Sequence, residues 1–324
     1  MSKLSYWIGA VAVAFSSTAA ASAETWPDRP LHIILPMAAG GNADIIARLI
    51  AKEVGDDLGQ PVIVENRPGA NGIIGLEAVR RAAPDGYTLL VSPSSPLVIN
   101  PVLYKKLPYD AQKDFHPISQ ILTYQYALVV PEESTVKSIG DLAAQAKAQP
   151  GALTYGSSGI GGGGHLAGEL LALELGAPLN HIPYKGTAPA LADLLGGQLS
   201  FTWDTVLTTV PYVQSGKLHP IAVSGPTRAS SLPDVPTMQE LGYPNYSITQ
   251  FVGLLAPAGT PAPIIERLHA SVAKAVQAPN VIKTLETDGG NDLVGGTPAE
   301  FEALITSELE FYRKLVNDAQ IKEF

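Results

Sequence analysis

Short apolar runs of strand length alternate with segments of helical periodicity along most of the chain. Residues 31–35 (LHIIL) form the first apolar run, and apolar residues then recur at three- and four-residue spacing from Ile46 to Leu58. Continuous apolar runs predict strands buried on both faces, and the longer spacing predicts amphipathic helices. Strands and helices that alternate at short intervals predict an α/β fold, with a mostly parallel sheet covered by helices on both faces.

The alternation occurs twice, because it restarts near residue 126 after a first series that begins at residue 31. In the first series, a helix is expected over residues 72–82 with Asn71 as its N-cap. The last third of the chain holds one apolar run, residues 251–255, followed only by helical segments. Too few strands remain for a third sheet, so these helices are expected to return to the first domain.

Two Rossmann-like domains joined by a two-strand hinge are therefore predicted. Removal of a leader from 324 residues leaves roughly 300, which exceeds the size at which a single core stops growing. Two chain segments that cross between domains form a hinge. The predicted boundaries are 24–124 with 246–324 for domain 1, 125–245 for domain 2, and hinge segments near 124–130 and 245–253.

The N-terminal segment has the features of a signal peptide. Lys3 supplies a basic start, residues 6–15 (YWIGAVAVAF) form an apolar run, and residues 21–23 (ASA) resemble a cleavage site. The run is shorter than the roughly 20 residues that a membrane anchor requires. We therefore expect residues 1–23 to be removed after Ala23 and the mature chain to be exported to the periplasm.

Charge and cysteine content exclude several functions. The formal net charge of −9 argues against nucleic acid and anionic membranes as partners. The chain has no cysteine, which excludes thiol catalysis, cysteine-ligated zinc and iron–sulfur clusters. We expect neither a cofactor nor a metal ion, and the sequence gives no sign of oligomerisation, so a monomer is expected.

Each half of the chain contains a glycine-rich turn between a strand and a helix. The first turn spans residues 36–44 (PMAAGGNAD) and the second spans residues 155–165 (YGSSGIGGGGH). Small residues leave backbone N–H groups uncovered at the start of a helix, where the dipole is positive. Such a turn can bind an anion without Lys or Arg, and open α/β sheets bind ligands at this end of their strands. The alternative is that both turns only connect strand to helix.

Five further residues are candidates, each with an alternative. Asp44 either complements the helix dipole or accepts a bond from a ligand amine or a bound water, and Asp204 either caps the next segment or selects ligands that carry a donor. His165 either packs as a neutral side chain or reaches the ligand. Tyr184 either packs at the rim or lines the cleft, and Ser94 is either a turn residue or a donor.

Several motifs, in this order, resemble the Bug family, the substrate-binding components of tripartite tricarboxylate transporters. The likeness covers nearly the whole mature chain. The motifs are PMAAGGNAD (36–44), ENRPGA (65–70), PDGYT (84–88), TYGSSG (154–159), IPYKG (182–186), LPDVPT (232–237) and APAGTP (256–261).

This resemblance implies a periplasmic, hinged protein of the type II periplasmic-binding-protein-like class that binds small carboxylates, often through ordered water. Its partners would be membrane transporter subunits. Met37, Ile160, Gly162 and Phe251 depart from the family's usual residues and leave the identity of the carboxylate open. The implied contacts are Met37, Ala38, Ala39, Gly40, Asn42 and Asp44 in the first turn, and Gly156, Ser157, Ser158 and Ile160 in the second.

Other functional classes fit the sequence less well. Residues 159–164 match a dinucleotide-binding fingerprint, but no acidic residue ends the next strand to hold a ribose. A serine hydrolase would need a second glycine where Ile160 stands. We therefore expect a binding protein and not an enzyme, with a secreted hydrolase as a remote alternative. A sensor accessory that presents its ligand to a membrane receptor remains an alternative to uptake.

Overall fold

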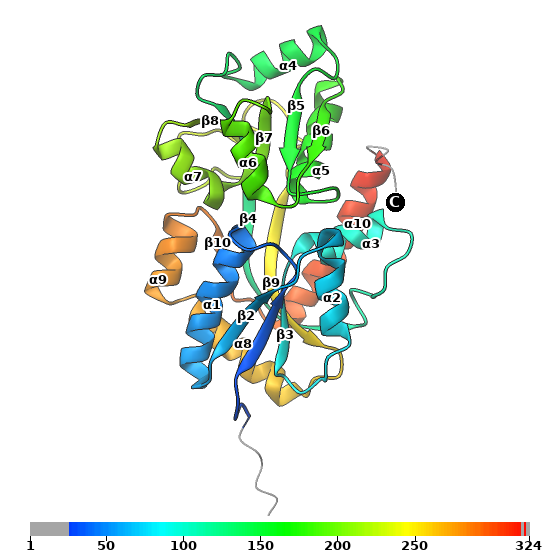
Figure 1. The fold of residues 1–324 in the computed structure, drawn as a ribbon, viewed down its shortest axis with the longest axis vertical. Coiled ribbons are helices and arrows are strands. Elements are labelled where there is room, and N and C mark those ends of the chain that lie inside the picture. Colours follow the sequence, from blue (N-terminus) through cyan, green and yellow to red (C-terminus); the bar gives the residue numbers. More distant parts are fainter. Residues whose placement is uncertain (1–25, 319–320, 322–324) are drawn as a thin grey trace, which may run out of the picture.

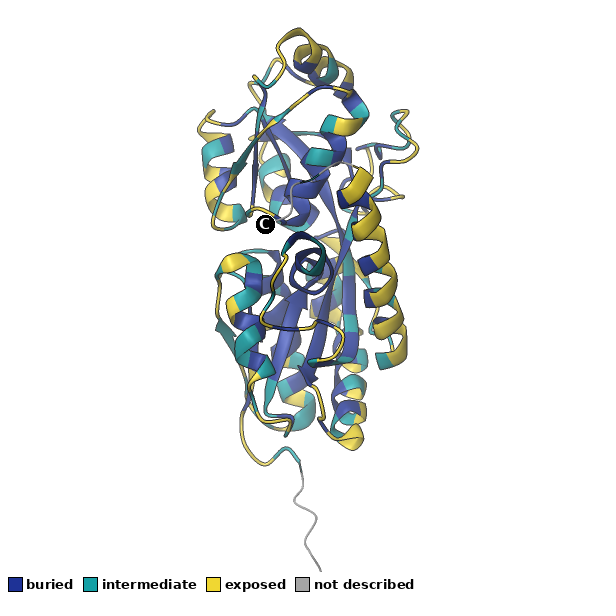
Figure 2. Ribbon diagram, turned by 90° about the vertical axis from the view of Figure 1, so that its right-hand side faces the viewer, coloured by how far each residue is buried: buried dark blue, intermediate teal, exposed yellow. Residues whose placement is uncertain are grey.

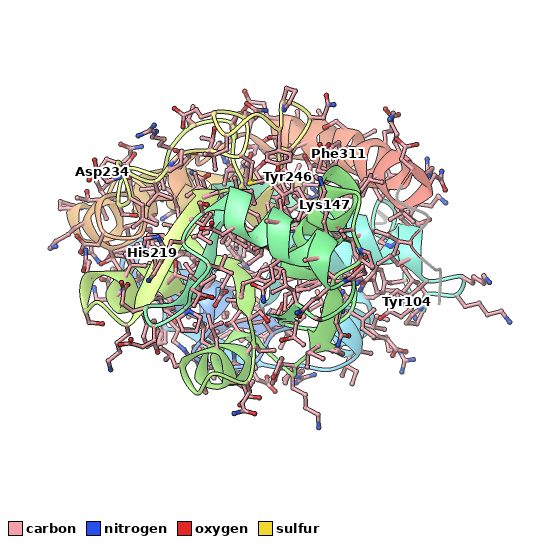
Figure 3. The ribbon with its side chains drawn as sticks, turned by 90° about the horizontal axis from the view of Figure 1, so that it is seen from above. Tyr104, Lys147, His219, Asp234, Tyr246 and Phe311 are labelled. Atoms are coloured by element: carbon pink, nitrogen blue, oxygen red, sulfur yellow. The ribbon has the colours of Figure 1, made fainter. Side chains whose placement is uncertain are left out.

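The computed structural model describes residues 26–318 and residue 321, so the predicted signal peptide lies outside the described residues. The elements between β4 and β9 in the sequence gather at one end of an elongated molecule (Figure 1). Most of the elements before β4 and after β9 lie toward the other end, and β4 and β9 run through the middle. Figure 3 views the molecule from the end where α4 lies outermost.

The strands form one continuous path in the order β2-β1-β3-β9-β4-β7-β5-β6, with β8 and β10 pairing with β4. Strands β1, β2 and β3 are parallel to one another, and β5 is parallel to both β6 and β7. The strands are β1 (Leu31–Leu35), β2 (Val62–Asn66), β3 (Thr88–Pro93), β4 (Phe115–Pro131), β5 (Thr154–Ser157), β6 (Asn180–Pro183), β7 (Phe201–Thr205), β8 (Leu218–Val223), β9 (Thr249–Pro257) and β10 (Asp292–Leu293).

Strand β4 belongs to two hydrogen-bonded sheets. Residues up to Gln125 pair with β9 in the first sheet, and residues from Tyr126 onward pair with β7 and β8 in the second. All these pairings are antiparallel, as is the pairing of β3 with β9. The expectation of a mostly parallel sheet is therefore wrong for its centre, because the two strands that carry the chain between the sheets run against their neighbours.

The helices cover these sheets much as the periodicity predicts. The α-helices are α1 (Asn42–Leu58), α2 (Ile73–Arg80), α3 (Asn100–Leu103), α4 (Ile139–Ala148), α5 (Gly163–Leu175), α6 (Thr187–Leu195), α7 (Val206–Gln214), α8 (Ala262–Ala275), α9 (Pro279–Val281) and α10 (Pro298–Asp318). The short helical turns are η1 (Ala70–Gly72), η2 (Ser95–Ile99) and η3 (Ile282–Thr287).

Two details differ from the sequence-based expectation. Asn71 does not cap α2, because it lies inside η1 with a φ of 48°, and Gly72 occupies the cap position. Helix α7 is not apparent from the sequence, because it contains Pro211 and two threonines, which favour other conformations. Helix α8 packs against α1, and α10 packs against η2 and α3.

Apolar side chains fill the space between sheets and helices. In Figure 2 the central strands are largely buried and many exposed positions lie on the outer faces of the helices, whereas the edge strands β2 and β6 contain no buried residue. Ile33 and Ile50 belong to the core around the first sheet, and Trp203 stacks on Tyr246 near the second with ring centroids 5.4 Å apart. Among the described residues, no helix combines the length and apolarity that crossing a membrane would require.

Candidate functional site

The first glycine turn connects β1 to α1 and leaves two backbone N–H groups at the helix start without a partner. Gly40 has a φ of 81°, and Gly41 occupies the N-cap position without a side chain that could accept a bond. Within the described residues, the amides of Asn42 and Ala43 donate to no protein group. These two amides sit at the positive end of a 17-residue helix.

Asp44 holds the first turn in shape. Its Oδ2 accepts a bond from the Gly40 N–H at 3.0 Å, and its Oδ1 accepts bonds from Arg48 Nε at 3.1 Å and Asn66 Nδ2 at 2.9 Å. Asn66 Nδ2 also donates to the carbonyl of Met37 at 3.1 Å. Burial acts to raise the pKa of Asp44, but the bonds from Arg48, Gly40 and Asn66 outweigh it and lower the pKa. Both oxygens of Asp44 and the amide of Gly40 are therefore used within the chain.

The second glycine turn connects β5 to α5 and presents three amides. Gly159 and Gly161 have φ values of 134° and 77°, and Gly162 is the N-cap of α5. In the part of the chain that the structure describes, the N–H groups of residues 163–165 donate to no protein group. Ser158 is exposed beside them, and its hydroxyl has no hydrogen-bond partner among the described residues.

Two histidines support the second turn from within. Ser157 Oγ lies 2.6 Å from His181 Nε2 and donates to the carbonyl of Gly159 at 3.0 Å. The Gly161 N–H donates to His165 Nδ1 at 3.2 Å. The two imidazole rings stack with centroids 4.2 Å apart. The Ser157 hydroxyl and the His165 ring are thus engaged in shaping the turn, and the structure shows His165 packed beside it.

The histidine pair should make the protein less stable in acid. Burial lowers the pKa of His165, and burial followed by repulsion from His165 lowers the pKa of His181 to about 3. The unfolded chain therefore binds more protons than the folded chain below the ordinary histidine value of about 6.5. We expect the urea midpoint to fall as the pH drops from about 6.5 toward 3. His181→Gln should reduce that slope between pH 6.5 and 5, and an unchanged slope would contradict this role for His181.

Each glycine turn lies close to residues from the other half of the chain. Thr187 Oγ1, at the start of α6, is 3.5 Å from the position that a Cβ of Gly41 would occupy. A Cβ on Gly161 would lie 3.1 Å from both Asn71 Nδ2 and Leu103 Cδ1 in the first half of the chain. Each turn therefore faces residues of the other half.

The remaining predicted residues lie around this region with different degrees of engagement. Gly156 is buried, with the Tyr184 ring 3.4 Å from the position that its Cβ would occupy, and Tyr184 donates its hydroxyl to Asp193 at 2.6 Å. The side chain of Ala38 lies 3.8 Å from the corresponding position of Gly186. Ile160 is exposed, and Ala39 lies in the first turn beside Gly40.

Three buried polar atoms near these turns have no partner in the described part of the chain: Asn42 Oδ1, Ser94 Oγ and Asp204 Oδ2. Asp204 Oδ1 accepts the Thr205 N–H at 2.7 Å, but Thr205 and not Asp204 occupies the N-cap position of α7, which has no side-chain cap bond. Burial raises the pKa of Asp204 to about 7, against the opposing effect of its bonds to Thr205 and Thr208. Asp204 can therefore carry a proton near neutral pH.

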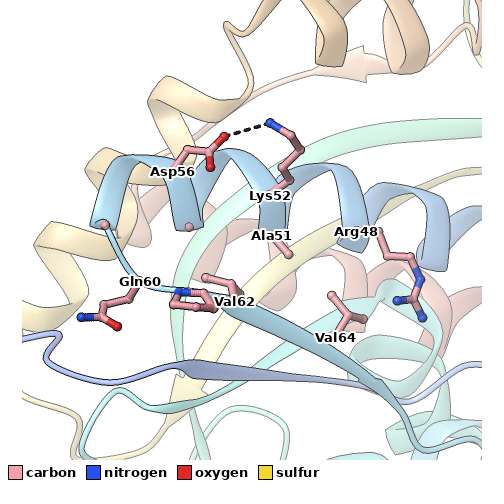
Figure 4. Close-up of a pocket in the computed structure, with 10 residues that line it drawn as sticks. Arg48, Ala51, Lys52, Asp56, Gln60, Val62 and Val64 are labelled. Atoms are coloured by element: carbon pink, nitrogen blue, oxygen red, sulfur yellow. Dashed lines mark hydrogen bonds and ion pairs between the residues drawn. The ribbon is translucent and has the colours of Figure 1, made fainter.

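A groove between α1 and β2 lies apart from the helix-start amides. Figure 4 shows Arg48, Lys52, Asp56, Val62 and Val64 along it, with Lys52 paired to Asp56 at 2.8 Å. Arg48 is held by Asp44 at 3.0 Å. Because these charged groups are already paired, the groove offers weaker recognition of an anion than the two turns do.

Sequence reasoning missed residues that shape the site from other elements. Asn66 lies within a motif noted above, but its contact with Asp44 depends on the pairing of β1 with β2. His181 reaches Ser157 because β5 and β6 are parallel neighbours. Spacing along the chain carries no signal for either contact, since both depend on strand register.

Comparison with known protein families gives one match over most of the chain. A family model described as "Tripartite tricarboxylate transporter family receptor" matches residues 46–321. Protein BugT of Bordetella pertussis (strain Tohama I) is 36% identical over 323 residues, and the match covers 99% of this chain and 99% of BugT.

Solved structures of similar sequence share the fold. The periplasmic binding protein BugD has 33% identity and a TM-score of 0.87, covering 92% of this chain and 100% of BugD. An R. palustris protein solved with adipate has 31% identity and a TM-score of 0.89, covering 92% and 100%. MatC from Rhodopseudomonas palustris, solved with bound malate, has 31% identity and a TM-score of 0.85, covering 90% and 100%.

Proposed function

The chain belongs to the tripartite tricarboxylate transporter receptor family, and from this membership we propose that it captures a small carboxylate and delivers it to transporter subunits in the membrane. The resemblance to the Bug family is confirmed, as is the α/β fold of the periplasmic-binding-protein class. Two similar proteins were solved with adipate and malate, which supports a carboxylate as the ligand here.

The start of α5 is the observation that carries this proposal. Its three unpartnered amides, residues 163–165, lie at the positive end of a 13-residue helix. Hydrogen bonds to a charged group contribute roughly 1.5–3 kcal/mol each, and micromolar affinity needs about −8 kcal/mol. Four or five such bonds to one carboxylate, from this helix and the first turn, reach that affinity after the cost of immobilising the ligand. Ser158 can add a hydroxyl donor.

We also propose that the ligand lies between two domains that close around it. Residues 24–124 with 246–324 would form one domain and residues 125–245 the other. The antiparallel strands β4 and β9 support this division, because they carry the chain between the two ends of the molecule. Strands that span two domains in this way can serve as a hinge.

The same site is proposed to bind without turnover. The family and the similar structures are binding proteins. Ser157 and His181 could suggest a nucleophile and its base, but Ser157 Oγ also donates to the Gly159 carbonyl. Among the described residues, no carboxylate contacts His181 to orient it as a catalytic base.

A thermal-shift comparison tests the proposed ligand class. Purified residues 24–324 should be stabilised by adipate or malate, because a ligand that binds only the folded chain adds about 2.7 kcal/mol at one hundred times its Kd. Dimethyl adipate and dimethyl malate are matched controls that keep the carbon skeleton but lack the charge, and they should give no shift. Stabilisation by the esters or by glucose, with none by a carboxylate, would refute the proposal.

A further inference from the structure

One side-chain oxygen receives three buried hydroxyl groups at the centre of the molecule. Gln250 Oε1 accepts hydrogen bonds from Tyr126 at 2.9 Å, from Tyr124 at 3.0 Å and, at a longer 3.4 Å, from Ser95. All four residues are buried. Burial raises the pKa of both tyrosines, so their hydroxyl groups keep the protons that they donate. We call Gln250, Tyr124 and Tyr126 the hinge cluster.

The hinge cluster spans the point where β4 passes from one sheet to the other. Tyr124 is the register partner of Gln250 in the first sheet. Tyr126 is the register partner of Thr205 in the second sheet. Gln250 Oε1 therefore accepts one hydrogen bond from a residue paired in the first sheet and one from a residue paired in the second. The bond from Tyr124 stays within one ladder, whereas the bond from Tyr126 joins the two.

The start of α5 rests directly on this cluster. A Cβ on Gly163 would overlap Tyr126 Oη and the side-chain amide of Gln250. Gly163 is the first residue of α5, and its N–H is one of the three unpartnered amides at the proposed site. A change in the orientation of Tyr126 therefore moves the amides that would meet the ligand.

The cluster is also anchored to the C-terminal helix. Gln250 Nε2 donates to Tyr312 Oη at 3.4 Å, and Tyr312 Oη donates to the Thr249 carbonyl at 3.3 Å. Tyr312 belongs to α10 and is fully buried. The Gln250 amide group is thereby held at its nitrogen as well as at its oxygen, which accepts from both tyrosine hydroxyl groups.

We infer that Gln250 is a positioning residue, which sets the orientation of the second sheet through Tyr126 and so presents the start of α5 to the ligand. The inference rests on the proposed function, since it concerns how that binding site is assembled. If the second sheet rotates relative to the first about β4 and β9, the bond from Tyr124 to Gln250 is kept, because both residues belong to the first sheet. The same rotation moves the Tyr126 hydroxyl away from Gln250. The Tyr126 bond therefore favours the arrangement seen here.

Two variants that each lack one tyrosine hydroxyl distinguish an effect on the orientation of the sheets from an effect on stability. Tyr126→Phe and Tyr124→Phe each remove one buried hydroxyl that donates to the same oxygen, so both should lower the melting temperature to a similar extent. Only Tyr126→Phe should shift the orientation of the sheets. Because the chain has no cysteine, nitroxide labels can be placed through Ala144→Cys in α4 and Ala270→Cys in α8, both exposed helical positions.

Electron–electron resonance distances between these labels, recorded without ligand, should shift or broaden in Tyr126→Phe and match wild type in Tyr124→Phe. Tyr126→Phe should also weaken binding of adipate or malate by about three- to tenfold, the effect expected for one hydrogen bond. Equal distance changes in both variants, or none in Tyr126→Phe, would overturn the inference. If wild type binds no carboxylate, the proposed function fails, while the ligand-free distances still decide the role of the hinge cluster.

Discussion

Replacing Gly164 by alanine should weaken carboxylate binding by about 100-fold or more. Gly164 is the second residue of α5, and a Cβ there would lie 2.6 Å from the backbone carbonyl of Trp203. A backbone group cannot rotate away, so the first turn of α5 has to move and its amides with it. Loss of two charge-assisted bonds removes about 3–6 kcal/mol, which corresponds to about 100-fold weaker binding or more. Calorimetric titration with adipate and malate would measure the change.

Gly140→Ala is a matched control, because Gly140 is the second residue of α4. A Cβ there meets only Ser138 Oγ, at an ordinary 3.6 Å. Alanine within a helix is favoured over glycine by roughly 0.5–1 kcal/mol, so this variant should be as stable as wild type or more stable and should bind normally. Wild-type affinity in Gly164→Ala would show that the start of α5 does not contact the ligand.

Asp44→Ala should cause the largest loss of stability among the polar residues of the site. The change removes the acceptor for Gly40, Arg48 and Asn66 at a buried position. With bonds to a charged group contributing about 1.5–3 kcal/mol each, and with Arg48 able to turn to solvent, the free energy of unfolding should fall by about 2–4 kcal/mol. Carboxylate binding should weaken as well, because the first turn loses the contact that fixes Gly40. Urea denaturation at pH 7 measures the first effect.

A second ion pair on the same helix provides the control. Asp56 pairs with Lys52 at the same four-residue spacing as Asp44 with Arg48, but both members of the Lys52–Asp56 pair are exposed. Asp56→Ala should therefore cost less than about 0.5 kcal/mol. The pKa of Asp44 is lowered, so its contribution is complete above the ordinary value near 4 and disappears as the pH falls through the folded-state pKa. Equal losses in the two variants at pH 7 would contradict the role given to Asp44.

The sequence carried most of the information about the secondary structure. Helix α1 and strand β1 agree closely with the apolar periodicity, because the helix buries one regular face and the strand is a short apolar run. The long strand β4 was recognised only from residue 126, since its earlier part, which includes Pro117 and Gln120, lacks an apolar run. The position of β9 between β3 and β4 could not be read from spacing, because strand order is set by packing between distant segments.

The candidate site was predictable where glycine spacing dictates backbone shape and not where side chains meet across strands. Both glycine turns lie at helix starts, as their composition indicates. The use of Asp44 and Ser157 within their own turns was not predictable, because it depends on Asn66 and His181 from neighbouring strands. Gln250 was missed for the same reason, since its three hydroxyl donors come from β4 and η2.

The place of β9 within the first sheet dictates an order of assembly. Strands β1, β2 and β3 are complete by residue 93, yet β3 meets its other neighbour only when residues 249–257 are present. Strands β5, β6 and β7 instead come from one continuous stretch that ends at residue 205. Because a chain is synthesised from its N-terminus, strands β5, β6 and β7 can therefore pair before the first sheet is complete. The earlier residues keep an uncovered strand edge until more than two-thirds of the 324-residue chain has appeared, which makes them the part most in need of protection from aggregation during synthesis.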